Sequence, residues 1–194
     1  MEENGKVPVF KASLIYGAIV GIISGLIALI LYFINQSLET WSMIASPLIF
    51  VILIVGALIM FRKEYGNGYA KFKQLVLVSF LVGIIAGIIS STFTIVLFEI
   101  DESYLQDTKY FAIERMDQQM EKMDARYQER FSPDQYDRIA DQMDAQREKQ
   151  TEKIMGRSSV SFAYTGIINL AFMALITGLI AGLFIKKNPP EPGM

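Results

Sequence analysis

The 194-residue sequence contains neither cysteine nor histidine. The missing cysteines exclude disulfide bonds and thiolate nucleophiles, and the missing histidines exclude imidazole bases. Together the two absences exclude most structural zinc and iron sites. No cofactor or metal is therefore expected, and an enzyme would have to use carboxylate, tyrosine, lysine or serine side chains. With no catalytic constellation visible, we expect a protein that is not an enzyme.

Charged side chains are missing from four long stretches, residues 12–34, 43–61, 75–98 and 160–185. A helix needs about 20 residues to cross the hydrocarbon core of a bilayer, so each stretch is long enough to span it. The first stretch exceeds the apolar region of a secretory signal peptide and is expected to be retained. The sequence predicts an all-α integral membrane four-helix bundle, with 1–194 as a single membrane domain.

The lysines and arginines of the short connections predict the orientation of the spans. Such residues stay in the cytoplasm, whereas long loops cross the membrane largely regardless of charge. The bases concerned are Lys6, Lys11, Arg62, Lys63, Lys71, Lys73, Lys186 and Lys187. Both termini are thus expected in the cytoplasm. The segment 101–157, with 14 acidic and 10 basic residues, is expected on the other side.

Small residues recur at every fourth position in three of the spans. They are Gly17, Gly21 and Gly25, then Ser79, Gly83, Gly87 and Ser91, and finally Ala174, Gly178 and Gly182. This spacing places each row on one face of a helix, where a neighbouring backbone can approach closely. Close helix packing is the expected role, and a glycine-lined groove for a lipid or substrate is the alternative.

Polar residues inside the spans are few. Asn169 lies in the fourth span, and Ser90, Ser91, Thr92 and Thr94 lie in the third. We expect Asn169 to form an interhelical hydrogen bond and the hydroxyls to bond to carbonyls of their own helix. An ion-coupled transporter would ordinarily need more ionisable groups than these.

The segment 101–157 is predicted to form a helical hairpin inserted between the third and fourth spans. Ser132 and Pro133 are typical of a helix start, so the turn falls near 131–132. Apolar residues at spacings of three and four predict a coiled-coil-like seam. They are Ile113, Met116, Met120, Met123 and Tyr127 on the first helix and Tyr136, Ile139 and Met143 on the second. A turn at this place would pair Tyr127 with Tyr136 and Met120 with Met143.

Two sharper interpretations of this segment compete with simple packing and solvation. Met116, Met120 and Met123 are soft ligands of the kind that bind Cu(I), but they share the apolar stripe, which favours packing. An acidic row is predicted on the face opposite the seam and either is solvated or binds cations. The row comprises Asp134, Asp137, Asp141, Asp144 and Glu148.

A family resemblance is carried mainly by residues 67–72 (NGYAKF), which precede residues 80–91 (FLVGIIAGIISS) and Phe93-Thr94. These residues resemble the bacterial membrane family known as domain of unknown function 4199, whose members are common in Bacteroidota. The charged insert rich in Gln and Met and the tail Lys186-Lys187-Asn188-Pro189-Pro190 fit the same pattern. Lys73 stands where a glycine is more usual. The resemblance implies a bacterial inner-membrane protein and supplies no catalytic residue.

Three functional classes remain after these exclusions. The first is a non-catalytic accessory or assembly subunit that uses 101–157 to contact a membrane or envelope protein or a second copy of itself as a homo-oligomer. The second is a small lipid or polyprenyl-sugar carrier or flippase-like subunit, and the third is an enzyme. Besides these protein partners, the lipid bilayer is the expected environment, and nucleic acid is not expected.

Overall fold

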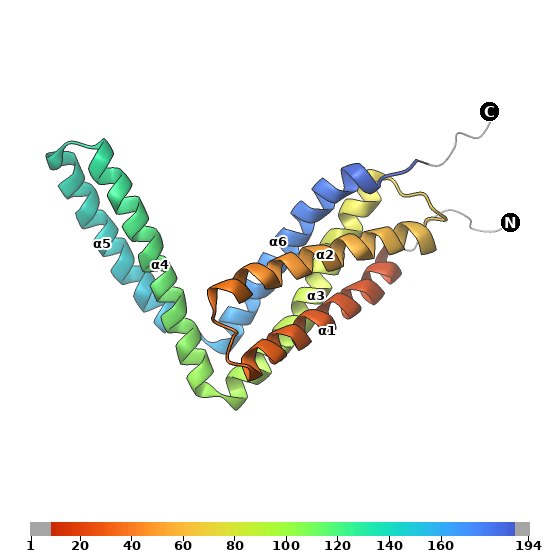
Figure 1. The fold of residues 1–194 in the computed structure, drawn as a ribbon, viewed down its shortest axis with the longest axis horizontal. Coiled ribbons are helices and arrows are strands. Elements are labelled where there is room, and N and C mark those ends of the chain that lie inside the picture. The colour runs from red at the N-terminus through yellow and green to blue at the C-terminus, as the bar shows by residue number, and fades with distance from the viewer. Residues whose placement is uncertain (1–8, 189–194) are drawn as a thin grey trace. The chain divides into compact units, whose positions relative to one another are not determined.

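The computed structural model describes residues 9–188, except the side chains of residues 133 and 134. Six helices follow one another along the chain (Figure 1): α1 (Val9–Phe33), α2 (Thr40–Glu64), α3 (Phe72–Ile100), α4 (Glu102–Arg130), α5 (Pro133–Met155) and α6 (Ser159–Ile185). No strand occurs among the described residues. The chain divides into two compact units, of which the second comprises Phe98–Ser161 and the first the described residues on either side.

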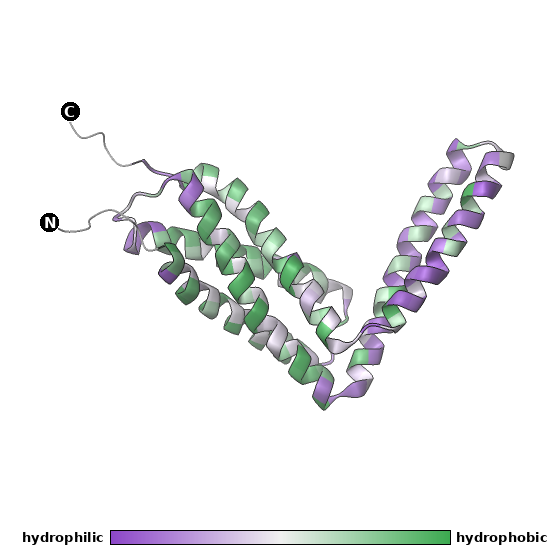
Figure 2. Ribbon diagram, turned by 180° about the vertical axis from the view of Figure 1, so that it is seen from behind, coloured by the Kyte–Doolittle hydropathy of each residue, from purple (hydrophilic) through white to green (hydrophobic). Residues whose placement is uncertain are grey.

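Helices α1, α2, α3 and α6 are the four predicted spans. They have 25, 25, 29 and 27 residues, respectively, and each is long and apolar enough to cross a membrane. At about 1.5 Å per residue they exceed the hydrocarbon thickness of about 30 Å. Figure 2 shows their predominantly apolar residues. The chain is therefore a multi-pass membrane protein. The helices begin one to three residues before the charge-free stretches, and α2 continues through Arg62 and Lys63 to Glu64.

The core of the first unit is centred on α2 and α3. Leu75, Val78 and Val82 of α3 are completely buried, as are Ile54 and Leu58 of α2. Ala12 and Val20 of α1 and Ala174 of α6 join the same cluster. All four apolar helices therefore contribute to one core, while many of their remaining large apolar side chains are exposed. Those exposed side chains form the surface that contacts lipid.

The turn between α2 and α3 is held against the chain that follows α6. Ala70 and Lys187 exchange two backbone hydrogen bonds, of 2.9 and 3.0 Å. The Arg62 guanidinium donates to the Ile185 carbonyl at 2.9 Å, which satisfies one of the carbonyls left without a partner at the end of a helix. Gly68 has φ +84°, a conformation that glycine adopts readily. Residues 67–72, which carried the family resemblance, thus form the turn that fixes the end of α6.

The second unit contains α4 and α5, which lie side by side and are joined at residues 131–132 (Figure 1). Asp101 caps α4 by accepting hydrogen bonds from the backbone N–H groups of Ser103 and Tyr104. Ser132 occupies the N-cap position of α5, as predicted, but its side chain makes no capping bond. At the other end of the unit the Ser159 hydroxyl donates to Glu99 at 3.3 Å, so the residues that enter and leave the unit are linked.

Candidate functional site

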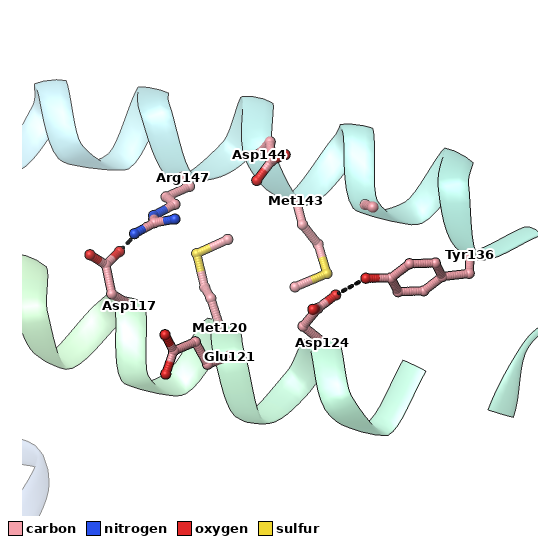
Figure 3. Close-up of a pocket in the computed structure, with 9 residues that line it drawn as sticks. Asp117, Met120, Glu121, Asp124, Tyr136, Met143, Asp144 and Arg147 are labelled. Carbon is pink, nitrogen blue, oxygen red and sulfur yellow. Dashed lines mark hydrogen bonds and ion pairs between the residues drawn. The ribbon is translucent and has the colours of Figure 1, made fainter. Parts of the chain in front are cut away.

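Side chains of α4 and α5 line a partly open cavity of about 180 Å³, which Figure 3 shows. The guanidinium of Arg147 is paired with Asp117 at 2.8 Å. About two turns further along α4, the Tyr136 hydroxyl donates to Asp124 at 2.7 Å and accepts from the Gln128 amide at 2.8 Å. Met120 and Met143 lie between these two polar links. The two helices are therefore connected by polar bonds on either side of these two methionines.

The two polar links shift the pKa values of Arg147 and Tyr136. The hydrogen bond and charge of Asp117 raise the pKa of Arg147, so this guanidinium stays charged. For Tyr136, the bond from Gln128 lowers the pKa, but the bond to Asp124, desolvation and nearby carboxylates outweigh it, and the pKa lies above its ordinary value. Both groups thus keep their bonding forms over the physiological pH range. Neither shift brings the pKa of Arg147 or Tyr136 toward neutral pH, where a general acid or base works best.

The methionines predicted to lie on one stripe have different environments. Met120 lines the cavity together with Met143 of α5. Met116 is half-buried and does not line the cavity, and the Met123 side chain is 45 % exposed. The Cu(I) hypothesis required Met116, Met120 and Met123 to face a common point, and the structure places only Met120 in the cavity.

Three other residues of the predicted seam, Tyr127, Tyr136 and Ile139, also lie in different environments. Tyr127 packs on Phe131 with ring centroids 5.7 Å apart, at the turn between the helices. Tyr136 bonds to Asp124 and Gln128, and Ile139 is half-buried without lining the cavity. The sequence alone suggested that Tyr136 would meet Tyr127. It missed the polar link to Asp124, because apolar periodicity carries no information about which carboxylate a hydroxyl will reach.

The acidic row on α5 does not lie wholly on the outer face. Asp144 borders the cavity beside Arg147, on the side facing α4, although it is exposed, as Asp137, Asp141 and Glu148 are. The side chain of Asp134 lies outside the described part of the structure. Within that part, no three acidic side chains are grouped closely enough to hold a metal ion. Asp137, Asp141, Asp144 and Glu148 therefore form a charged, exposed surface on α5.

The glycine rows of the spans face neighbouring helices. A Cβ atom added to Gly17 or Gly21 would lie 2.7–2.8 Å from Ile85 or Ile89 of α3, and one added to Gly25 would overlap the Phe93 ring. The other side of α3 contacts α6 in the same way. There the close contacts involve Gly83 with Ala174, Gly87 with Ile167, Gly178 with Ser79 and Gly182 with Phe72. Neighbouring helices pack directly against these glycines. Little space therefore remains beside the glycines for a groove that could bind a lipid or substrate.

Hydroxyl groups strengthen the contact between α3 and α6. Ser79 donates to the Ala174 carbonyl, and Ser91 donates to the Ala163 carbonyl at 3.1 Å. Thr92 and Thr94 instead bond to carbonyls of their own helix, as the sequence suggested. Asn169 differs from the expectation: its side chain is exposed and makes no hydrogen bond to another described residue. The interhelical bond expected for Asn169 is therefore not formed among residues 9–188.

A second cavity, of about 210 Å³, lies among all four apolar helices near Pro47. Its lining is mainly apolar, with the hydroxyls of Ser24, Ser46, Ser90 and Thr94 among the side chains that border it. Pro47 lies inside α2 and has no N–H group, so it removes one helical hydrogen bond at this point. This volume is below the 300–1,000 Å³ typical of small-molecule sites, so the cavity suits part of a lipid chain better than a whole amphiphile.

Comparison with known proteins identifies the family. The sequence model of DUF4199, described as a protein of unknown function, matches residues 15–187. The chain therefore belongs to the DUF4199 family, as the turn at residues 67–72 and the charged insert suggested. No curated protein and no solved structure matches the chain.

Proposed function

We propose that this member of the DUF4199 family is a non-catalytic accessory or assembly subunit of the bacterial inner membrane. In this proposal α1, α2, α3 and α6 form a four-helix anchor with both termini in the cytoplasm. The helical hairpin α4–α5 lies on the opposite side and binds another protein or a second copy of the chain. The basic residues between α2 and α3 and after α6 support this orientation, because such residues resist translocation.

The observation that carries the proposal is the character of the α4–α5 surface. This unit is compact on its own, yet it leaves Tyr110 61 %, Met123 45 % and Phe131 40 % exposed. Aromatic and methionine side chains are enriched at protein interfaces, and helices commonly bind partners through such anchors. These exposed side chains therefore support a role of the α4–α5 unit in protein contact.

Cysteine crosslinking tests the proposal directly, because the chain has no cysteine of its own. Gln146→Cys places a single thiol on an exposed position of α5, and Glu39→Cys places one on the exposed connection before α2 as a control. Oxidation or a short bismaleimide in native membranes should give an adduct from position 146. A band of twice the 21.9 kDa chain would indicate a second copy, and a larger adduct another protein. A monomer without adducts, or equal adducts from both positions, would contradict the proposal.

A small lipid carrier is the second candidate function, and the cavity near Pro47 is the observation that favours it. Ala28 lines this cavity, whereas Ala18 of the same helix does not. Ala28→Phe should therefore fill the cavity and reduce photocrosslinking of an acyl-labelled phospholipid, while Ala18→Phe should leave it unchanged. Equal labelling of both variants would remove the support that this cavity gives to a carrier function.

A further inference from the structure

Asn169 occupies an unusual position in α6. It is the eleventh of the 27 residues of a helix that crosses the membrane, so it lies about 5 Å from the helix midpoint. Its side chain is exposed on the surface of the first unit and bonds to no other described residue. Polar side chains inside membranes normally face other helices, because hydrocarbon offers no hydrogen-bond partner. The amide of Asn169 thus needs a partner that the described chain does not supply.

The residues around Asn169 form a pattern that suits a helix partner. Positions spaced alternately by three and four residues along α6 follow a heptad seam. They are Thr165, Asn169, Phe172, Ile176, Leu179 and Leu183. All are exposed except the half-buried Thr165. The seam lies away from Ala174 and Gly178, whose row packs on α3. The seam therefore stays accessible after the four helices have packed.

We propose that α6 is the membrane interface of a homodimer in which Asn169 binds Asn169 of a second copy. A carboxamide has both a donor and an acceptor, so two copies related by a two-fold axis satisfy each other. Two copies inserted into the membrane with the same orientation are related by a two-fold axis along the membrane normal. This symmetry makes the two α6 helices parallel. A single Asn in a heptad seam is the arrangement that fixes register and stoichiometry in parallel helix pairs. This interface is independent of the proposed role of α4–α5.

Single-cysteine crosslinking in native membranes tests this interface, because the natural chain lacks cysteine. Ile176→Cys places a thiol on the seam, seven residues after Asn169. Tyr164→Cys serves as the control, because Tyr164 is 64 % exposed but lies about 140° around the helix from Asn169. Oxidation should give a disulfide-linked dimer from position 176 and not from position 164. No dimer from position 176, or equal dimers from both positions, would overturn the proposal.

The role of the amide is tested by adding a second substitution to Ile176→Cys. Asn169→Leu keeps the approximate size but removes the hydrogen-bonding groups, and should reduce the dimer roughly 3- to 10-fold. Asn169→Gln retains a carboxamide and should preserve most of it. Since Asn169 makes no hydrogen bond to another described residue, both variants should melt in detergent close to the temperature of the parent. Unchanged crosslinking in Asn169→Leu would overturn the assignment to Asn169, as would an equal loss in Asn169→Gln.

Discussion

At the residue scale, the glycines of the spans have clearly different environments although the sequence presents them alike. A Cβ atom on Gly83 would overlap Ala174, whereas one on Gly56 of α2 would meet nothing within 4 Å. Both residues lie inside apolar helices, so their intrinsic helix propensities are the same. Their difference comes entirely from the neighbouring helix.

This difference predicts opposite effects of the same substitution. Gly83→Ala should destabilise the protein by about 1–3 kcal/mol, because α6 must move away from α3. Gly56→Ala should be neutral or slightly stabilising, because alanine favours the helix and no neighbour is displaced. Thermal unfolding of both variants in detergent measures the contrast. Equal melting temperatures would contradict the close contact between α3 and α6.

Gly66 lies in the turn before α3, where the surrounding backbone leaves no room for a side chain. An added Cβ atom there would overlap the Tyr69 carbonyl oxygen and lie 2.9 Å from the Arg62 carbonyl oxygen. Gly66→Ala should distort the turn, weaken the pairing of Ala70 with Lys187 and lower the melting temperature. Hydrogen exchange of the Ala70 and Lys187 amides should increase in this variant. Unaltered exchange at both amides would show that the turn accommodates the methyl group.

At the scale of the helices, polar contacts join α4 and α5 at positions that the apolar periodicity did not indicate. Tyr136 connects the helices through Asp124 and Gln128, and Arg147 connects them through Asp117. These links use groups that are exposed or half-buried, and such contacts contribute modestly to stability. Their main effect is to fix which side chains of the two helices face each other.

The Tyr136 link predicts a loosening of the pair at alkaline pH. The folded-state pKa of Tyr136 is raised, so its contribution is complete below the ordinary value of about 10 and is lost as pH rises through the folded value. Spin labels on Gln119→Cys and Gln142→Cys should report a broader distance distribution above that pH. The further variant Tyr136→Phe should show a distribution that no longer depends on this transition. A transition of the same size in Tyr136→Phe would assign it to another group.

At the scale of the whole molecule, the proposed topology places the α4–α5 hairpin on one side of the membrane. It places the basic turn between α2 and α3 on the other side. Ser132→Cys in the α4–α5 turn should react with a membrane-impermeant maleimide in intact spheroplasts. Lys71→Cys, beside the turn after α2, should react only after permeabilisation. Both parent residues are exposed, so burial does not explain a difference. The reverse pattern would invert the orientation deduced from the basic residues.

The sequence predicted those features that depend on local composition and spacing. The absence of charge over about 20 residues identified four spans, and Ser132-Pro133 located the start of α5. The four-residue spacing of glycines identified the helix faces that approach one another, but it did not specify that α1 and α6 contact α3 on different faces. The partner of a helix face depends on residues distant in the chain, which periodicity cannot identify.

The sequence by itself determined that this protein is helical, crosses the membrane and carries a charged helical segment, because hydrophobic length and charge act locally on the chain. Only the tertiary structure decided which polar groups are satisfied. It paired Tyr136 with Asp124 and Ser79 with Ala174, and it left Asn169 exposed. A hydrogen bond requires two groups to meet at a defined distance and angle. That meeting depends on how the helices rotate and pack, and this was the information missing from the linear pattern.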